Sequence, residues 1–117
     1  MDPLRRTLTN PDMERMLQVM DLFRVLDREM PAQVIACFLY IASHNNCHKT
    51  ALEQDLGMPT ASGSRNTDWL SKHHRLRKPG LNLITKEVDP LNRKRTQLKL
   101  TDKGHDLVKR IEAILYG

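Results

Sequence analysis

The stretch VDPLNRKRTQLKLTDKG, residues 88–104, decides the fold of this 117-residue chain. Its Asp-Pro and Asn residues favour a turn, and the flanking segments LNLITKEV (81–88) and TQLKLT (96–101) have the β-branched and alternating residues of strands. The pattern therefore predicts a β-hairpin over 81–101. Three adjacent cations lie where we expect its tip: Arg93, Lys94 and Arg95.

A final helix is predicted directly after the hairpin, over about 102–115. Thr101 has the side chain of an N-cap, and Asp102 places a negative charge in the first turn, where the helix dipole favours it. The apolar residues that follow recur at helical spacing: Leu107, Val108, Ile111, Ile114 and Leu115. This helix is therefore amphipathic.

Two shorter helices joined by a glycine-containing turn are predicted upstream of the hairpin. The first covers about 50–56, because Thr50 and Glu53 have the spacing of a capping box and Gly57 favours a helix end. The second covers about 60–74 and begins with small polar residues. Such a pair is typical of a helix-turn-helix motif.

Two longer helices precede this motif, after an N-terminal tail over 1–10. Asn10 followed by proline is typical of a helix start, and the spacing of the apolar residues predicts a helix over about 11–29. The next helix, over about 31–44, is apolar on almost all sides and is expected to be buried. We therefore predict one winged helix-turn-helix domain over 11–117, mainly α with a small β-hairpin wing, in the order α-α-α-α-β-β-α.

Composition and charge define the class of partner. The chain is 39% hydrophobic and 28% charged, has no membrane span or signal peptide, and contains two cysteines, so we expect a reduced, cytoplasmic globular protein. Its net charge of +5 is uneven: residues 1–71 carry seven Lys/Arg against nine Asp/Glu, whereas residues 72–110 carry twelve against four. Nucleic acid is the expected partner of the second part, and a solvated basic surface is the alternative.

Predicted DNA contacts begin in the second helix of the helix-turn-helix. The N-terminal residues of such a helix reach base edges in the major groove, and the candidates are Thr60, Ser62, Ser64, Arg65 and Asn66. Arginine pairs with guanine and asparagine with adenine. Gly63 indicates close packing or close approach at this point, because glycine is unfavourable inside a helix.

The remaining candidate contacts are basic. A basic segment follows that helix, and it is expected to bind phosphates, with a merely solvated loop as the alternative. Its residues are Lys72, His73, Arg75, Arg77 and Lys78. The wing cations are expected to enter the minor groove or to bind flanking phosphates, with a solvated turn as the alternative. Asp89 at the base of the hairpin is expected to pair with Arg93 or Arg95.

At these residues the sequence resembles the multiple-antibiotic-resistance regulator (MarR) family of winged-helix transcription factors. DPLNRKRTQLKLTDKG matches the family's wing pattern, D-P-x-D-R-R followed by alternating residues and L-T-x-x-G, and LGMPTASGSRNTDWL follows its recognition-helix pattern. The likeness covers roughly residues 30–115. It implies a transcriptional regulator that binds double-stranded DNA, usually as a dimer on a palindromic site. Such a regulator is often a repressor that a ligand or an oxidant releases from DNA.

The sequence also departs from the family pattern. Asn92 stands where the family favours Asp, Lys94 stands where it favours Arg, and the segment between Leu70 and Gly80 is longer than usual. The family's additional C-terminal dimerisation helix does not follow the 102–115 helix, so dimer contacts are expected from the first and last helices. The candidates, which core packing would explain as well, are Met13, Met16, Leu17, Met20, Phe23, Ile111 and Leu115.

Other kinds of site are not predicted. His44, Cys47 and His48 are metal-ligand types, but three ligands within five residues form a poor tetrahedral set, so we expect no metal and no cofactor. Cys37 lies in an apolar helix and is expected to be inert core, whereas Cys47 is a weak candidate for a redox sensor. The sequence has no nucleophile triad, paired-carboxylate site or phosphate-binding glycine loop, so an enzyme is not expected.

The sequence therefore predicts a sequence-specific double-stranded DNA-binding transcriptional regulator, a repressor acting as a homodimer. Two alternatives stay open. One is a winged-helix module that binds a host or transcription-machinery protein, since the fold does not determine function. The other is a non-specific, architectural DNA binder.

Overall fold

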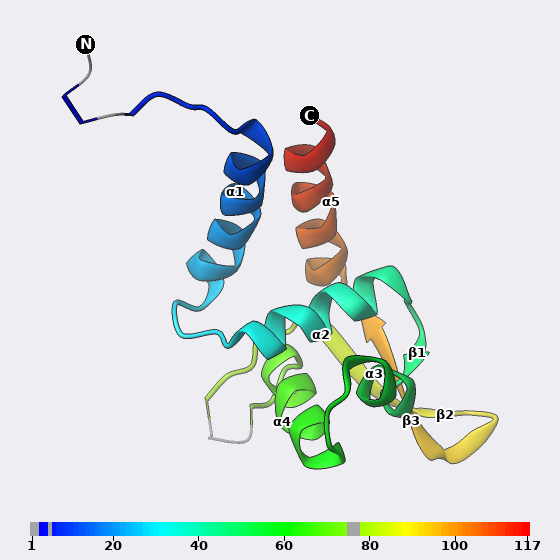
Figure 1. Ribbon diagram of the computed structural model, residues 1–117. Coiled ribbons are helices and arrows are strands. Elements are labelled where there is room, and N and C mark those ends of the chain that lie inside the picture. Colours follow the sequence, from blue (N-terminus) through cyan, green and yellow to red (C-terminus); the bar gives the residue numbers. More distant parts are fainter. Residues whose placement is uncertain (1–2, 5, 75–77) are drawn as a thin grey trace.

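The computed structural model describes residues 3–4, 6–74 and 78–117, and within them it contains five helices and three strands. In chain order the elements are α1 (Pro11–Leu26), α2 (Ala32–Ser43), β1 (Cys47–His48), α3 (Lys49–Leu56), α4 (Thr60–Leu70), β2 (Ile84–Asp89), β3 (Asn92–Leu100) and α5 (Asp102–Tyr116). Helices α1 and α5 pack side by side at one end of the molecule (Figure 1). Helix α4 and the β2–β3 hairpin lie at the other end. The predicted winged helix is confirmed.

The predicted caps and stops are present at three helix ends. Asn10 Oδ1 accepts a hydrogen bond from the Met13 amide at 3.2 Å, and Thr101 Oγ1 accepts one from the Gly104 amide at 3.0 Å. Gly57 ends α3 with a φ of +63°, in the left-handed region that glycine adopts without strain. Local sequence chemistry therefore determines where these helices start or stop.

Helix α1 ends at Leu26, so the predicted end near residue 29 is wrong. The backbone of Asp27 is extended, and its carboxylate accepts one hydrogen bond from a neighbouring residue and one from a distant residue. Oδ1 lies 2.9 Å from the Glu29 amide and Oδ2 lies 2.8 Å from Trp69 Nε1. This carboxylate therefore stabilises the turn that follows the helix. Helix α2 likewise covers Ala32–Ser43 rather than 31–44.

The boundaries of the helix-turn-helix also differ from the prediction. Helix α3 begins at Lys49, one residue before the predicted start, so Thr50 lies within the helix and the expected capping box with Glu53 does not form. Glu53 pairs with Lys49 instead. Helix α4 ends at Leu70 rather than near 74, because the returning chain donates to its last carbonyls, with the Leu83 amide 2.8 Å from the Leu70 oxygen.

The wing is a tighter hairpin than predicted. Strands β2 and β3 are joined through Pro90 and Leu91, so Arg93, Lys94 and Arg95 lie on β3 and not at the tip. The sheet has three antiparallel strands in the order β1-β3-β2, with Cys47 opposite Leu98. The two-residue strand β1 was not predicted, because it is too short to show a strand pattern.

One apolar core connects all the helices and the sheet. Its members are Phe23, Val34, Ile35, Cys37, Phe38, Ile41, Leu52, Leu70, Leu83, Ile84, Leu98, Leu107 and Ile111. The rings of Phe23 and Phe38 meet edge to face with centroids 5.7 Å apart, a favourable aromatic geometry. The prediction that Phe23 and Ile111 are dimer contacts is therefore wrong, because both side chains are buried within the chain. In the described part of the chain, no helix is long and apolar enough to cross a membrane.

Candidate nucleic-acid interface

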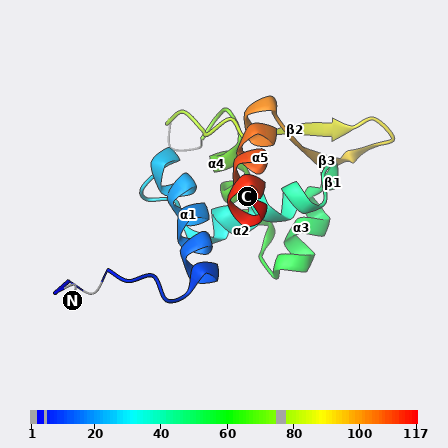
Figure 2. The same ribbon diagram turned by 90° about the horizontal axis from the view of Figure 1, so that it is seen from above.

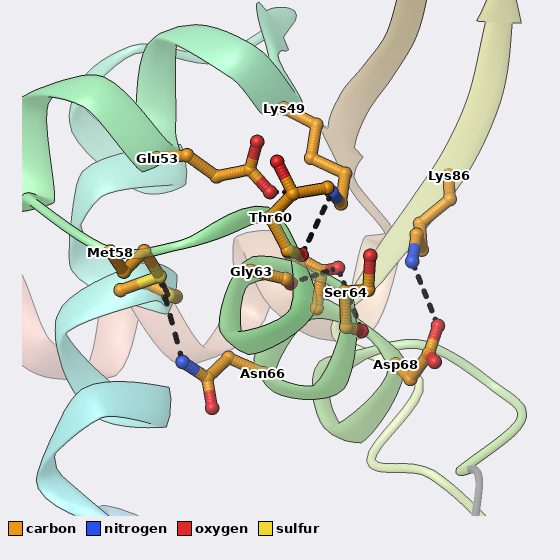
Figure 3. A network of polar contacts seen from close by, with 11 residues as sticks. Lys49, Glu53, Met58, Thr60, Gly63, Ser64, Asn66, Asp68 and Lys86 are labelled. Atoms are coloured by element: carbon orange, nitrogen blue, oxygen red, sulfur yellow. Dashed lines mark hydrogen bonds and ion pairs between the residues drawn. The ribbon is translucent and has the colours of Figure 1, made fainter.

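A buried ion pair fixes the start of α4 against α3. Lys49 Nζ lies 2.5 Å from Glu53 Oε2 and 3.5 Å from the carbonyl oxygen of Thr60, the first residue of α4 (Figure 3). Glu53 is only 8% exposed and packs directly against Gly63. A Cβ at Gly63 would lie 2.1 Å from Glu53 Oε2, which confirms the close packing expected from this glycine.

The first turns of α4 present small polar residues and one arginine. Thr60 and Arg65 are exposed, while Ser62 and Ser64 are half-buried. Arg65 Nη2 lies 3.3 Å from Ser62 Oγ, so the guanidinium keeps most of its donors available. These four of the five predicted base-contacting residues therefore lie together on one helix end.

Asn66 is the exception among the α4 candidates, and its predicted contact with adenine is wrong for this conformation. It is 8% exposed, and its amide nitrogen lies 3.4 Å from Gln33 Oε1 and 3.6 Å from Met58 Sδ (Figure 3). Asn66 therefore connects α4 to the core. Trp69 and Leu70 also anchor this helix, because Leu70 is buried and Trp69 donates to Asp27.

A second ion pair connects α4 to the wing. Lys86 Nζ on β2 lies 2.8 Å from Asp68 Oδ1 on α4, and both side chains are largely buried (Figure 3). The pair joins residues 18 positions apart in sequence, and it restrains the hairpin relative to the helix. The ion pair therefore restrains the position of the wing relative to α4, the other element predicted to contact DNA.

The wing cations are exposed and lie beside a turn held by Asp89. Arg93, Lys94 and Arg95 occupy the first part of β3. Asp89 does not pair with either arginine, contrary to the prediction: its Oδ2 lies 2.6 Å from His48 Nε2, and its Oδ1 accepts from the Leu91 amide at 2.8 Å. The Leu91 amide first and His48 second lower the pKa of this carboxyl.

The helix end and the wing project from the same side of the molecule. Figure 1 shows α4 and the β2–β3 hairpin below α2, away from the free ends of α1 and α5. Figure 2, viewed from above, shows the hairpin extending beyond the helical body. This arrangement leaves the exposed side chains of both elements accessible to one elongated partner.

The basic segment after α4 is described in part. Lys72, His73 and Lys78 are exposed, whereas Arg75 and Arg77 lie outside the described residues. An antiparallel bridge between His73 and Pro79 places the two described ends of this segment side by side.

Of the residues predicted to form the dimer contact, some are exposed and others are buried in the core. Helix α1 exposes Met13, Met16, Leu17 and Met20, and α5 exposes Leu115. Phe23 and Ile111 lie inside, so Met13, Met16, Leu17 and Met20 form an exposed apolar stripe along α1, and Leu115 is exposed separately on α5. An open hollow lined in part by Leu8, Glu14 and Ile114 lies between the ends of α1 and α5.

The cysteines lie in unreactive surroundings. Cys37 is buried as predicted, and burial raises the pKa of its thiol to about 11. Cys47 is half-buried on β1, and burial also raises the pKa of its thiol. Neither environment favours the thiolate that redox sensing requires. Among the described residues, no group of three or more His, Cys, Asp or Glu side chains is arranged to hold a metal ion.

Comparison with solved structures identifies the fold as that of MarR-type transcriptional regulators. The match to MarR has a TM-score of 0.60 at 21% identity and covers 90% of this chain and 75% of that chain. S. aureus MepR in a complex with DNA matches with a TM-score of 0.65 at 16% identity over 88% of this chain and 74% of its own. A MarR-like transcriptional regulator from Thermotoga maritima matches with a TM-score of 0.61 at 18% identity, over 93% and 77%.

No protein-family model and no curated protein sequence matches the chain. At these identities the structural likeness establishes the winged-helix fold and leaves the function to the residues of the interface.

Several functional residues were missed by reasoning from sequence alone. Lys49 and Glu53 have the i,i+4 spacing of a helical ion pair, which was a usable signal. The contacts of His48 with Asp89 and of Lys86 with Asp68 join distant positions, and only the folded structure brings them together.

Proposed function

We propose that this protein is a sequence-specific double-stranded DNA-binding transcriptional regulator that acts in the cytoplasm as a homodimer. It represses transcription by occupying its site. Helix α4 enters the major groove, and the β2–β3 hairpin reaches the adjacent minor groove. One observation carries the proposal: the polar end of α4 and the basic start of β3 project from the same side, and the Lys86–Asp68 ion pair connects α4 to strand β2 of the same hairpin.

Base recognition is assigned to the start of α4. Arg65 is the strongest candidate, because an exposed guanidinium can donate two hydrogen bonds to one guanine. Thr60, Ser62 and Ser64 are short enough to let the helix backbone approach the groove floor. The Lys49–Glu53 pair supports this assignment because it holds the helix start in a fixed position.

Phosphate binding is assigned to exposed basic residues of two elements. These are Arg93, Lys94 and Arg95 on β3, and Lys72, His73 and Lys78 in the segment after α4. Arg75 and Arg77 stay candidates by sequence. Contacts of this kind orient a protein on a duplex and make its affinity depend on salt, without selecting a sequence.

A second copy of the chain is the partner proposed for the apolar stripe on α1, with Leu115 of α5 as a separate candidate contact. Met13, Met16 and Leu17 are each at least half exposed, at 55%, 58% and 50%. A contiguous exposed apolar surface of this kind marks an interaction site. Association through it leaves α4 and the wing free on the opposite side, as binding to two half-sites requires.

A mobility-shift assay with two substitutions tests the proposal. The duplex is the one most enriched from a random library by the wild-type protein. Arg65→Ala should cost about 1–3 kcal/mol on that duplex and relax one base position, whereas Arg93→Ala should weaken binding to all duplexes about equally. Arg93→Ala should also lower the slope of log affinity against log salt by roughly one.

Arg24→Ala is the matched control, because Arg24 is an exposed α1 cation whose ion pair with Asp21 lies within the same helix. It removes the same charge from a helix outside the proposed interface and should leave binding nearly unchanged. Unaltered binding by both Arg65→Ala and Arg93→Ala would remove the proposal.

The apolar α1 stripe also favours a second function, as a module that binds another protein. Capture of a partner from a nuclease-treated lysate, together with no enrichment of any duplex, would support that function. Equal affinity for all duplexes would indicate architectural binding.

A further inference from the structure

The tip of the wing is apolar, although the strand behind it is basic. Leu91, at the turn, is 95% exposed, and Val88 on β2 is 63% exposed. Pro90 between them is also exposed. A single exposed leucine needs no explanation, but these three apolar side chains gather at the end of a hairpin that extends away from the body (Figure 2). The foremost surface of the wing is therefore hydrophobic.

The tip is held in one conformation. Asp89 Oδ1 accepts the Leu91 amide at 2.8 Å, while Oδ2 of the same carboxylate binds His48 of β1 at 2.6 Å. Pro90 fixes its own φ, and Asn92 Oδ1 accepts the Lys94 amide at 3.1 Å. The turn is therefore tied to the central sheet, and its apolar end is presented with little entropy left to lose on binding.

The charge around the tip selects its partner. Arg93, Lys94 and Arg95 follow the turn at once, and all three are exposed. A neutral lipid or an apolar protein pocket could accept the leucine, but the three adjacent cations also favour a polyanion, and a duplex is the polyanion that the adjacent polar end of α4 fits. In a duplex, phosphates border the minor groove on both sides, so the cations bind those phosphates while the tip faces the base pairs.

We propose that Leu91, supported by Pro90 and Val88, is an apolar wedge that enters the minor groove between two base pairs and kinks the duplex. This inference rests on the proposed DNA-binding function and adds a deformation to it. Leucine and proline wedges of this kind partly unstack one base step and bend DNA by roughly 20–90°. Because pyrimidine–purine steps unstack most easily, the wing favours such a step without any hydrogen bond to a base.

The test measures bending and unstacking at saturating protein. The probe is the duplex most enriched by the wild-type protein, with a fluorescent donor and acceptor at its ends, and in a second version with 2-aminopurine at the step under the wing. The wild-type protein should shorten the end-to-end distance and raise the 2-aminopurine fluorescence. Leu91→Ser should abolish both signals while its affinity falls by roughly tenfold or less.

Two further variants complete the design. Leu91→Phe keeps an apolar wedge and should retain the kink. Val25→Ser makes a similar apolar-to-polar change at an 83% exposed position of α1, and should behave as wild type. Far-ultraviolet circular dichroism confirms that each variant is folded.

The outcomes separate this inference from the proposed function. Tight binding of an unbent duplex by the wild-type protein overturns the wedge and leaves DNA binding intact. A kink that survives Leu91→Ser overturns it as well. If the wild-type protein binds no duplex under any condition, both proposals fall.

Discussion

Lys86 on β2 and Asp68 on α4 form a 2.8 Å ion pair that joins the wing to the recognition helix. Both side chains are largely shielded, at 24% and 19% exposure, so solvent and salt screen the pair less than a surface pair. Because grooves of B-form DNA have a fixed spacing, two elements that contact adjacent grooves must keep a fixed separation. The pair provides that restraint.

Loss of this restraint should weaken specific binding without unfolding the protein. Lys86→Met keeps the apolar stem and removes the charge, and we expect a loss of about 1–2 kcal/mol in binding of the selected duplex. Lys99→Met is the control, because Lys99 pairs with Glu87 within the same sheet at 3.0 Å and does not connect to α4 in the described structure. Equal effects of the two substitutions on Kd, measured by fluorescence anisotropy, would show that the restraint is unimportant.

Gly63→Ala should destabilise the protein, although alanine is the better helix former by about 1 kcal/mol. The new Cβ would lie 2.1 Å from Glu53 Oε2 and 2.6 Å from its Cγ, and Lys49 holds this buried side chain in place. We expect a net loss of about 1–3 kcal/mol in the free energy of unfolding, measured with urea.

A double-mutant cycle checks the cause of that loss. In the background of Glu53→Ala, which removes the clashing atoms, Gly63→Ala should be neutral or stabilising. An equal loss in both backgrounds would assign the effect to something other than Glu53.

The turn of the wing should lose stability in acid. The hydrogen bonds of Asp89 with Leu91 and His48 lower its carboxyl pKa below the ordinary value of 3.8. A lowered pKa stabilises the folded state above the unfolded value, and the contribution disappears as the pH falls through the folded pKa. The stability advantage of wild type over Asp89→Asn should therefore shrink as the pH falls below the ordinary pKa of the carboxyl. Urea titrations at a series of pH values would contradict this if the difference stayed constant in acid.

The apolar stripe should control the oligomeric state. Leu17→Glu places a charge at a half-exposed position of the stripe and should convert a dimer into a monomer. Val25→Glu adds the same charge on α1 at an 83% exposed position outside the stripe, and should leave the dimer intact. Sedimentation velocity at several concentrations distinguishes the states. A monomeric wild-type protein at high concentration would exclude a dimer through this face.

The local parts of this fold were predictable from sequence because their causes lie within a few residues. Asn10 and Thr101 accept their capping bonds from amides three positions away, and Gly57 adopts the expected left-handed turn. The wing was predicted from alternation and turn residues. Its tip was misplaced because Arg93 and Arg95 are as compatible with a strand as with a turn.

Long-range contacts were not predictable in the same way. Phe23 belongs to the same apolar spacing as Met20, and only the packing of α1 against α2 and α5 determines which of the two is buried. His48 and Asp89 are 41 positions apart, and β1 is too short to show a pattern. Asn66 had the right residue type for adenine, but its helix face points to the core.

The most direct test of the central claim is methylation interference on the duplex selected by the wild-type protein. Dimethyl sulfate methylates guanine in the major groove and adenine in the minor groove, so one experiment reports contacts in both. If α4 and the wing bind adjacent grooves, methylated guanines at the centre of each half-site and methylated adenines in the neighbouring minor groove should both block binding. Interference confined to one groove, or absent from both, would contradict the account.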